Sequence, residues 1–459
     1  MPSDRTQTPR SIGLLLALLC ACNTTEVVGT IPAGADLSDP SGSVDAFSGD
    51  AAGSADYCAG SGPPILRSPG ATDGGVGEKA CTGRLAQVAF RYGLCTCAAF
   101  NAGAAVTVDS YDSQQMMSPR SLGGSVGVNG NLSTSSAVDI SGSLWVGDPN
   151  GLNFTSVKIG QELRSAGSAV GSGSLTVGGD AFVNGDANTG GALSVGGILT
   201  TPAGRLVAGN PGPQRVQRAP VSVAPPCHCS AANLIDVAGY VKADRTQNDN
   251  QALPLDPERL HNFNGDVSLS LPCGRYYLTR VNGTGKLTLQ INGRVALFVG
   301  ENIEFSQDLT INLGPAGQLD LFVGGTLLGS AALRLGSPET AARLRVYVAS
   351  TSSIALSGAV TLSGNLYAPL ASLNVGGALT VNGALFVKNL ATPAPVVIHH
   401  DAAIFRAGDA CPAPPAACKT CRDCGNQACQ NGACGSCTDD SGCCAPLQCK
   451  NGQCVYILG

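Results

Sequence analysis

The segment Gly173–Gly185 reads GSLTVGGDAFVNG, with apolar residues at every second position around paired glycines. Alternation with a period of two is typical of a β-strand that buries one face. The same pattern, apolar-x-apolar-x-Gly-x-apolar, recurs along the first half of the chain. It fits Val126–Leu132, Val138–Leu144, Leu175–Ala181 and Leu193–Leu199, and it fits Val157–Leu163 with the glycine moved by one position.

The spacing of these copies favours a stacked repeat. In the first half they start 12, 19, 18 and 18 residues apart, and a second set starts 32, 33 and 19 residues apart. The second set comprises Leu289–Val295, Leu321–Leu327, Ile354–Val360 and Leu373–Leu379. Such short strands cannot bury a core alone, so consecutive turns must stack, each adding about 4.8 Å. We predict an all-β fold, a right-handed parallel β-helix in two blocks; a β-sandwich is the structural alternative.

The amino-acid composition agrees with the narrow interior of a β-helix and argues against a nucleic-acid partner. Charged residues make up 13% of the chain and aromatic residues 5%, whereas glycine occurs 61 times in 459 residues. We therefore expect a core of small aliphatic side chains, with glycine where the backbone must bend tightly. The net charge of −5 gives no basic footprint for nucleic acid. We predict no nucleic-acid partner, no cofactor and no metal.

The N-terminus reads as an export signal. Arg5 and Arg10 precede the apolar run Ile12–Leu19, which is too short for a membrane-spanning helix. The following Leu19-Cys20-Ala21-Cys22 resembles a bacterial lipobox in which Cys22 is the residue that becomes lipidated. It departs from the usual pattern at Cys20, two positions earlier, where a small residue such as alanine or serine is commoner. We predict lipidation at Cys22 and an outer-membrane address, facing the periplasm or the cell surface. An ordinary cleaved secretory signal is the alternative.

Beyond the signal region, 18 cysteines remain, an even number that predicts disulfides in an oxidising compartment. Two Cys-x-Cys pairs, Cys95/Cys97 and Cys227/Cys229, could also offer zinc four thiolates and the imidazole of His228, although export favours disulfides. The disulfide candidates are Cys58, Cys81, Cys95, Cys97, Cys227, Cys229, Cys273, Cys411, Cys418, Cys421, Cys424, Cys429, Cys434, Cys437, Cys443, Cys444, Cys449 and Cys454.

These features predict nine segments. They are a lipoprotein signal peptide (1–22), a flexible Ala/Gly/Ser/Asp linker (23–57), an N-terminal cysteine-containing module (58–119), solenoid block 1 (120–209), a Pro-rich linker with Cys-x-Cys (210–230), an intervening β segment (231–286), solenoid block 2 (287–405), a Pro/Ala linker (406–417) and a cysteine-rich disulfide module (418–459). The last module has too few apolar residues for a core, so disulfides must hold it.

The region Leu287–Phe405 resembles an uncharacterised β-solenoid domain family of exported proteins in Gram-negative soil bacteria and of pilus-associated proteins. The resemblance is carried by LFVGGTLLGS, by SGNLYAPLASLNVGGALTVNGALFVKNL and by the closing VVIHHDAAIF. The upstream LCTC and VDSYDS motifs of Leu94–Ser113 and the CC-containing tail resemble accessories of that family. The repeats also resemble bactofilins, polymer-forming β-helical scaffolds that are cytoplasmic, short and poor in cysteine. The resemblance to the β-solenoid family implies a β-solenoid fold and a location at the cell surface, and it does not indicate an activity.

The motif His399-His400-Asp401 is the strongest candidate for a site, since it holds two of the four histidines beside a carboxylate. A metal or acid–base role would need partners from elsewhere in the chain. We favour a polar cap at the end of the solenoid. Asp109 and Asp112 precede the repeats and are expected to be turn residues.

We therefore expect a non-catalytic outer-membrane lipoprotein that acts as a structural or adhesive scaffold of the envelope. Its expected partners are the membrane, through the lipid, and envelope polysaccharide or further copies of itself. A carbohydrate-binding protein is the first alternative. It would need outward aromatic residues in register, and the local cluster is Tyr276, Tyr277, Phe298, Phe305 and Phe322. A polysaccharide lyase or hydrolase is the second, and it would need acids that converge in a groove.

Overall fold

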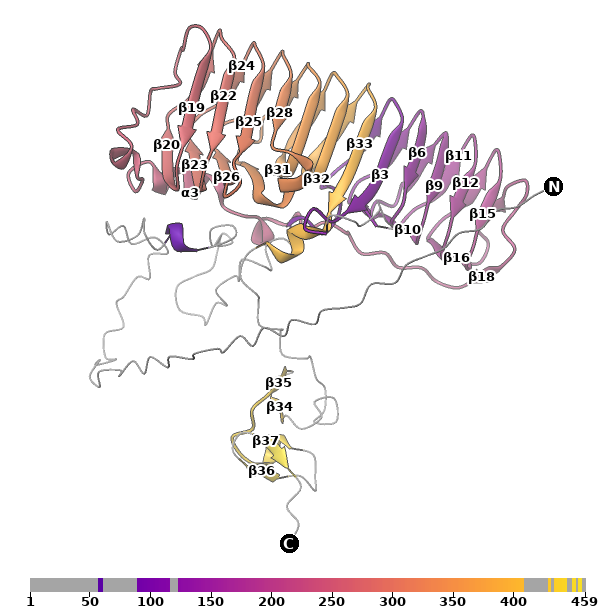
Figure 1. Cartoon of the computed structure of the whole chain (residues 1–459). Helices are drawn as coiled ribbons and strands as arrows, with labels where there is room; N and C mark the ends of the chain where they lie inside the picture. Colours follow the sequence, from indigo (N-terminus) through magenta and orange to yellow (C-terminus); the bar gives the residue numbers. More distant parts are fainter. Residues whose placement is uncertain are drawn as a thin grey trace, which may run out of the picture. The chain divides into compact units, whose positions relative to one another are not determined.

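The computed structural model describes residues 57–60, 89–115, 123–407, 428–430, 433–443, 448–450 and 453–455. Its principal unit is a parallel β-solenoid of about 14 turns (Figure 1). The predicted fold class is confirmed, and the β-sandwich is excluded because neighbouring strands of this unit pair in parallel. Cys22, with the predicted signal peptide and nearly all of the linker after it, lies outside the described residues. No helix in the described part of the chain is both long and apolar enough to cross a membrane.

Each turn contributes one strand to each of three faces, and most strands are only three residues long. In such a strand the first and third side chains are buried and the middle one points outward, as in Leu175–Val177. The inward side chains form one continuous core that runs through all the turns. Alternation in the sequence thus maps directly onto the inside and outside of the solenoid.

Each face is a ladder of strands that follow one another along the solenoid. Face 1 consists of β19 (Val267–Leu271), β22 (Leu287–Ile291), β25 (Leu309–Leu313), β28 (Leu333–Leu335), the first parts of β31 (Val360–Val375) and β32 (Leu379–Thr392), β33 (Val396–Asp401), β3 (Val106–Tyr111), β6 (Ala137–Ile140), β9 (Ser156–Ile159), β12 (Leu175–Val177) and β15 (Leu193–Val195). Face 2 consists of β20 (Gly274–Leu278), β23 (Arg294–Val299), β26 (Gln318–Val323), β29 (Leu344–Val348), the middle parts of β31 and β32, β1 (Leu94–Thr96), β4 (Val126–Val128), β7 (Leu144–Val146), β10 (Leu163–Ser165), β13 (Ala181–Val183), β16 (Leu199–Thr201) and β18 (Val216–Arg218). Face 3 consists of β21 (Val281–Gly283), β24 (Ile303–Phe305), β27 (Leu327–Gly329), β30 (Ile354–Leu356), the last parts of β31 and β32, β2 (Phe100–Ala102), β5 (Leu132–Thr134), β8 (Leu152–Phe154), β11 (Ala169–Gly171), β14 (Ala187–Thr189) and β17 (Val207–Ala208).

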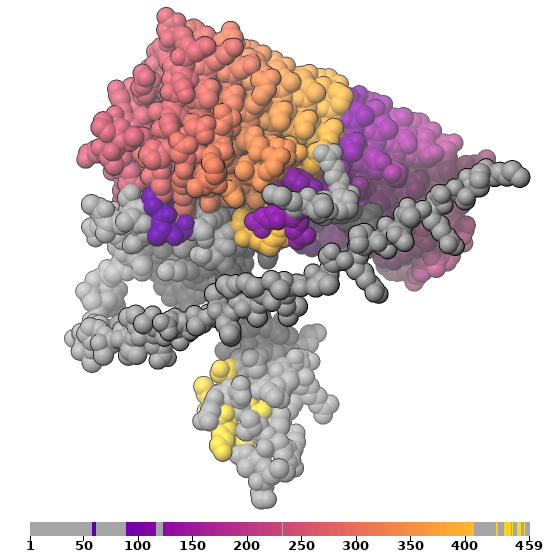
Figure 2. All heavy atoms as spheres, in the orientation of Figure 1, coloured from indigo at the N-terminus to yellow at the C-terminus, as the bar shows by residue number. Residues whose placement is uncertain are grey.

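The turns are not stacked in chain order. The chain enters near the middle of the solenoid, builds turns outward to β18, and returns to the opposite end to build turns back toward the middle. The N-terminal stack (94–218) and the C-terminal stack (267–401) then meet, because β1 pairs with β32 on one edge and with β4 on the other. Figure 2 shows this junction, where atoms of the C-terminal stack lie directly against those of the N-terminal stack.

One turn at the junction is built from both stacks, and we call it the composite turn. β33 supplies its face-1 strand, while β1 and β2 supply the strands on faces 2 and 3. The predicted N-terminal module (58–119) and intervening segment (231–286) therefore differ from the structure, since 94–111 and 267–283 belong to the solenoid. The repeat motif did not reveal these turns, because β1 and β19 are not followed by its glycine at the usual position.

Three of the repeat glycines, which were predicted to make tight bends, do lie at bends, and close packing between turns gives a second reason for glycine there. Gly160, Gly178 and Gly196 occupy equivalent corners, and none has a positive φ. A Cβ atom at each would lie 2.2 Å from a carbonyl oxygen of the preceding turn. Glycine is required here because the backbones of successive turns approach too closely for any side chain.

Between the two stacks, residues 219–262 form a return segment that runs along the outside of face 2. It carries the helices η1 (Ala231–Asn233), α3 (Val237–Asp244) and η2 (Asn250–Ala252). Its apolar residues pack on a row of outward aromatic side chains that continues from turn to turn. The members of this aromatic row are Tyr277, Phe298, Phe322, Tyr347, Tyr367 and Phe386.

Three disulfides fix these segments to the solenoid. Cys95–Cys227 joins β1 of the composite turn to the start of the return segment, and Cys97–Cys229 does the same from the residue that follows β1. Cys58–Cys273 joins the described N-terminal residues to the far end of the C-terminal stack. Each bond closes a loop of more than a hundred residues, which restricts the unfolded chain strongly.

Two further helices and the C-terminal hairpins complete the described structure. η3 (Pro338–Arg343) lies between β28 and β29, and η4 (Ala402–Arg406) follows β33. In the C-terminal segment, β34 (Ala428–Gln430) pairs with β35 (Ala433–Gly435), and β36 (Gln448–Lys450) pairs with β37 (Gln453–Val455), both antiparallel. η6 (Asp440–Gly442) lies between these hairpins. Disulfides Cys437–Cys449 and Cys443–Cys454 hold this segment, and Cys429 is also disulfide-bonded.

Asp244 at the end of α3 should make stability depend on pH. Its side chain is 1% exposed, and neither carboxylate oxygen has a hydrogen-bond partner among the described residues. Burial raises the pKa of Asp244 to about 7, against the attraction of Arg275. The folded state therefore binds a proton that the unfolded state has already lost, so stability falls as pH rises from about 4 to 7.

Replacing Asp244→Asn is expected to remove this fall and to raise the free energy of unfolding at pH 8 by about 2 kcal/mol. The gain stays below the full cost of ionising a buried carboxyl because the asparagine amide would also lack partners. Thermal unfolding at pH 5 and pH 8 measures both effects. Asp139→Asn, at an exposed ion pair with Lys158, serves as the control. An unchanged pH profile in Asp244→Asn would contradict the assignment.

Candidate functional site

The composite turn brings together the two polar motifs that the sequence analysis singled out. β33 carries His399-His400-Asp401 and pairs in parallel with β3, which carries Asp109. Nδ1 of His399 lies 2.5 Å from Oδ1 of Asp109, and both side chains are largely buried. The motif was predicted to cap an end of the solenoid. It lies instead inside the stack, because a further turn covers the free edge of β33.

Asp401 is fully buried and accepts three hydrogen bonds. Its carboxylate receives the Ser113 amide at 2.9 Å and the Ser113 hydroxyl at 2.6 Å. It also receives the Ala403 amide at 3.0 Å, which makes it the N-cap of η4. One carboxylate therefore fixes both the segment after β3 and the helix after β33.

His400 points to the opposite side of β33 and is also buried. Its Nε2 lies 3.0 Å from the carbonyl oxygen of Phe90, and its ring makes an edge-on contact with Phe405. Burial lowers the pKa of His400, although the Phe90 carbonyl and Asp401 act in the other direction. A neutral imidazole that donates to a carbonyl suits this position.

Arg406 closes the arrangement at the surface. Its Nη2 donates to both carboxylate oxygens of Asp112, at 2.6 and 2.7 Å, and its Nε donates to Gln114 at 3.1 Å. Asp112 is a turn residue, as predicted, because its carbonyl accepts from the Gln115 amide at 3.1 Å and its carboxylate from the Gln114 amide at 3.0 Å. The prediction is wrong for Asp109, which lies within β3. We call the whole arrangement the seam clasp: Asp109, Asp112, Ser113, His399, His400, Asp401 and Arg406.

The chemistry of the seam clasp is that of a structural joint. His399 and Asp401 pair with side chains of the other stack, His400 pairs with the Phe90 carbonyl that precedes that stack, and the pairs are largely buried. A general acid or base needs a proton-bearing atom open to a substrate. The clasp gives its atoms to hydrogen bonds between the two stacks.

Asp401→Ala is expected to lower the free energy of unfolding by about 3 kcal/mol, since three buried donors lose their acceptor at once. Amide hydrogen exchange should rise first in residues 109–115 and 402–406, which this carboxylate joins. Asp139→Ala, which removes only an exposed ion pair, should change neither quantity measurably. Unaltered exchange at both segments in Asp401→Ala would show that the clasp does not hold the stacks.

The cysteine pairs considered for zinc are bonded to one another across the composite turn. Asn129 supports this junction, because its side chain donates to the Cys227 carbonyl at 2.9 Å and accepts from the Cys227 amide at 2.8 Å. In the C-terminal segment the sulfur atoms of Cys437, Cys443 and Cys454 lie within 4.8 Å of one another, but all three are in disulfides. Cys81, Cys411, Cys418, Cys421, Cys424 and Cys444 lie outside the described residues, and the side chain of Cys434 is not described.

The predicted aromatic cluster divides between the inside and the outside. Tyr276 and Phe305 point inward and belong to the core. Tyr277, Phe298 and Phe322 point outward and stack in register, with ring centroids of the two phenylalanines 4.9 Å apart. The return segment covers them, so that Phe322 is wholly inaccessible. These rings stabilise the fold and offer no platform for a sugar.

On face 2 of the N-terminal stack, Trp145 and Phe182 remain partly exposed. The guanidinium of Arg164 lies between them, 5.1 Å from the Trp145 ring centroid and 4.7 Å from that of Phe182. Arg164 is also held by Glu162. One face of each ring is therefore already occupied by a cation.

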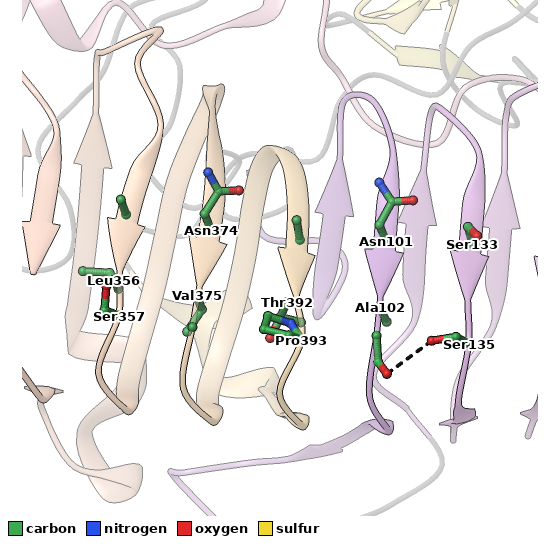
Figure 3. Close-up of a pocket in the computed structure, with 14 residues that line it drawn as sticks. Asn101, Ala102, Ser133, Ser135, Leu356, Ser357, Asn374, Val375, Thr392 and Pro393 are labelled. Atoms are coloured by element: carbon green, nitrogen blue, oxygen red, sulfur yellow. Dashed lines mark hydrogen bonds between the residues drawn. The ribbon is translucent and has the colours of Figure 1, made fainter. Parts of the chain in front are cut away.

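Two open grooves lie on face 3, which the sequence analysis did not single out. One spans the composite turn, has a volume of about 670 Å³ and is drawn in Figure 3. Its lining is Asn101, Ala102, Gly103, Ser133, Ser135, Ala355, Leu356, Ser357, Asn374, Val375, Gly376, Ala391, Thr392 and Pro393. The other, of about 760 Å³, lies over β21, β24 and β27, and Glu304 is its one charged residue. Neither groove holds converging acids.

The comparisons with known proteins concern the same part of the chain. No curated protein and no solved structure matches the chain. Residues 230–406 match a family model described as Domain of unknown function (DUF7305). This range holds most of the return segment and the whole C-terminal stack, and it ends with η4 of the seam clasp.

Proposed function

We propose that the protein is an exported, non-catalytic β-solenoid scaffold of the cell envelope that acts through its exposed faces. The observation that carries this proposal is the composite turn. The motif His399-His400-Asp401, whose side chains are the most suited to catalysis, joins the two stacks there through contacts such as His399–Asp109. Long-range disulfides hold the same junction. Residues that could have served catalysis serve the rigidity of a long surface.

Export and anchoring belong to the proposal. Three disulfides with sequence separations of 132 to 215 residues agree with an oxidising compartment. Lipidation at Cys22 would tether the solenoid to the outer membrane through the linker that follows. The proposed partners are the membrane, through this lipid, and envelope material that contacts the exposed faces.

Two alternatives are less well supported: carbohydrate binding by stacking on aromatic rings, and polysaccharide cleavage. A carbohydrate-binding protein that stacks sugars on aromatic rings would need the aromatic row open, but the return segment covers it. A polysaccharide lyase or hydrolase would need acids that converge on a substrate. The groove at the composite turn is lined wholly by uncharged residues.

Co-sedimentation tests the proposal. The oxidised chain from Cys58 to Gly459 is incubated with cell-envelope fragments, and a protein-only tube is spun alongside. We expect pelleting with the envelope and a soluble protein without it. Pelleting in both tubes would mean self-association, which also fits a scaffold. A protein that stays in the supernatant in both tubes would contradict the proposal.

A further inference from the structure

The outward residues of face 3 alternate between asparagine and an uncharged alanine, serine or valine over nine consecutive turns. We call them the face-3 row. Neighbours in the row are partners across the strand ladder, so their order is fixed by the register of the sheet. In spatial order the row reads Ala355, Asn374, Ala391, Asn101, Ser133, Asn153, Val170, Asn188 and Ala208.

The alternation crosses the composite turn without a break. Asn374 and Ala391 belong to the C-terminal stack, and Asn101 and Ser133 belong to the N-terminal stack. Ala391 and Asn101 are neighbours in space although 290 residues separate them in the chain. Figure 3 shows Asn374 and Asn101 projecting from their strands toward the same side.

The fold does not use these asparagines. Asn374, Asn101 and Asn153 are exposed and Asn188 is half-buried, and no hydrogen bond within the described part of the chain involves their side chains. Asparagines elsewhere on face 3 behave differently, since Asn282 donates to Asn262 at 2.9 Å. An exposed amide without a partner contributes little to stability, so the regular placement points outward, to a ligand.

The chemistry of the row describes that ligand. None of the nine residues is charged, and the groove over the first five of them, from Ala355 to Ser133, has no charged lining residue. Each amide offers two donors and one acceptor, which suits a partner with many hydroxyl groups. The other members of the row are three alanines, one serine and the exposed Val170, which leave room along the row for a continuous chain.

The distance between successive asparagines indicates which kind of hydroxyl-rich ligand would fit. Strands of adjacent turns are about 4.8 Å apart, so successive asparagines lie about 9.6 Å apart along the axis. In an extended β-1,4-linked polysaccharide each sugar is flipped relative to the last, so the same edge recurs at every second sugar over a comparable distance. Amides at every second turn would meet the same hydroxyls each time.

We propose that the face-3 row binds an extended, neutral β-1,4-linked polysaccharide that runs along the solenoid axis. The four amides hydrogen-bond its hydroxyls at every second sugar, and the residues between the amides accommodate the other sugars. This proposal rests on the proposed function, since it names the material to which the scaffold adheres. It needs the assembled composite turn, because neither stack alone presents all four amides in sequence.

Co-sedimentation of the oxidised Cys58–Gly459 chain with amorphous cellulose and with chitin tests the proposal. Starch, an α-linked glucan, and alginate, a polyanion, are the comparison materials. We expect pelleting with cellulose or chitin, and little with starch or alginate. Equal pelleting with alginate, or none with either β-linked glycan, overturns the proposal.

Variants test the row itself. Combining Asn374→Ala, Asn101→Ala, Asn153→Ala and Asn188→Ala should weaken glycan binding at least about tenfold, since several hydrogen bonds are lost together. Far-ultraviolet circular dichroism and the melting temperature should stay unchanged because these amides have no partners in the fold. A matched variant on face 1 replaces exposed or half-buried hydroxyl residues at Thr107, Thr176, Ser194 and Thr361 with alanine and should bind as the wild type does.

A second variant tests the period rather than the number of amides. Combining Asn101→Ala with Ser133→Asn keeps four amides but moves one by a single turn. It should bind no better than Asn101→Ala alone; wild-type affinity in this variant overturns the spacing argument. Pelleting with envelope fragments is measured in parallel, so that envelope binding unaffected by the four-asparagine variant removes this proposal while the scaffold stands.

Discussion

Replacing Asp320→Leu is expected to lower the free energy of unfolding by about 4 kcal/mol, because it leaves a buried guanidinium without its counter-ion. Asp320 and Arg345 are neighbours on adjacent turns of face 2 and are 0% and 1% exposed. Two parallel hydrogen bonds join them, at 2.6 and 2.9 Å. Arg345 also donates to the carbonyl of Ala342 in η3 at 2.7 Å.

Arg345 keeps its charge in the folded protein. Burial alone would lower the pKa of Arg345, but the Asp320 carboxylate outweighs it and raises that pKa above its ordinary value. Once the carboxylate is removed, the guanidinium must either stay charged in an apolar setting or move to water. Moving would displace η3, which packs against β29 and β31. Either outcome is costly.

The matched control is the double variant Asp320→Leu with Arg345→Met. Removing both charges should restore most of the lost stability, since replacing a whole buried pair by apolar side chains is often close to neutral. Urea unfolding followed by circular dichroism gives the midpoints for the three proteins. If Asp320→Leu alone is as stable as the wild type, the pair does not stabilise this part of the solenoid.

The solenoid was predictable because its signal is local. Each motif copy contains a strand, a corner and the start of the next strand, so one segment such as Gly173–Gly185 already shows which side chains face inward. The period near 18 residues then requires stacking. Nothing in this inference depends on residues distant in the chain, and the structure confirms it.

The order of the turns could not be read in the same way. A strand such as β4 pairs equally well with any turn of suitable register, so the repeat does not say which stack lies beneath it. That choice depends on particular long-range contacts: the disulfides of Cys95 and Cys97, and the His399–Asp109 pair. Cysteine counts predict that bonds form but leave the partners open.

The same reason explains the outcome for the candidate sites. His399, His400 and Asp401 were singled out correctly as unusual, but the partners that join them to the other stack lie 288 to 310 residues earlier in the chain. The face-3 row was missed because its asparagines and the residues between them lie on successive turns of the solenoid, far apart in the sequence. Residues such as Asn101 and Asn374 look ordinary until the register places them in one line.

A second large effect is expected at the inner corner of face 3, where phenylalanine and glycine alternate between turns. The order along the solenoid is Phe263, Gly283, Phe305 and Gly329, and each is the ladder partner of the next. Phe154 and Gly171 repeat the arrangement in the N-terminal stack. These glycines do not bend the chain; the ring of the neighbouring turn fills the space that their side chains would take.

Gly329→Val is therefore expected to lower the free energy of unfolding by about 3 kcal/mol through overpacking. A Cβ atom at Gly329 would lie 2.1 Å from Cζ of the Phe305 ring, and the core around that ring is closely packed. Gly212→Val, at an exposed position with an open surrounding, is the control and should have little effect.

The pairing can be isolated with a double-mutant cycle. Phe305→Ala alone should also cost about 3 kcal/mol, because it leaves a cavity. In the double variant the valine at position 329 would occupy part of that cavity, so the combined loss should fall short of the sum by more than about 1 kcal/mol. Additive losses would mean that ring and glycine do not share the space. A clear shortfall would show that each turn selects the residue of the next by volume, which is how a repeat of such short strands keeps its register.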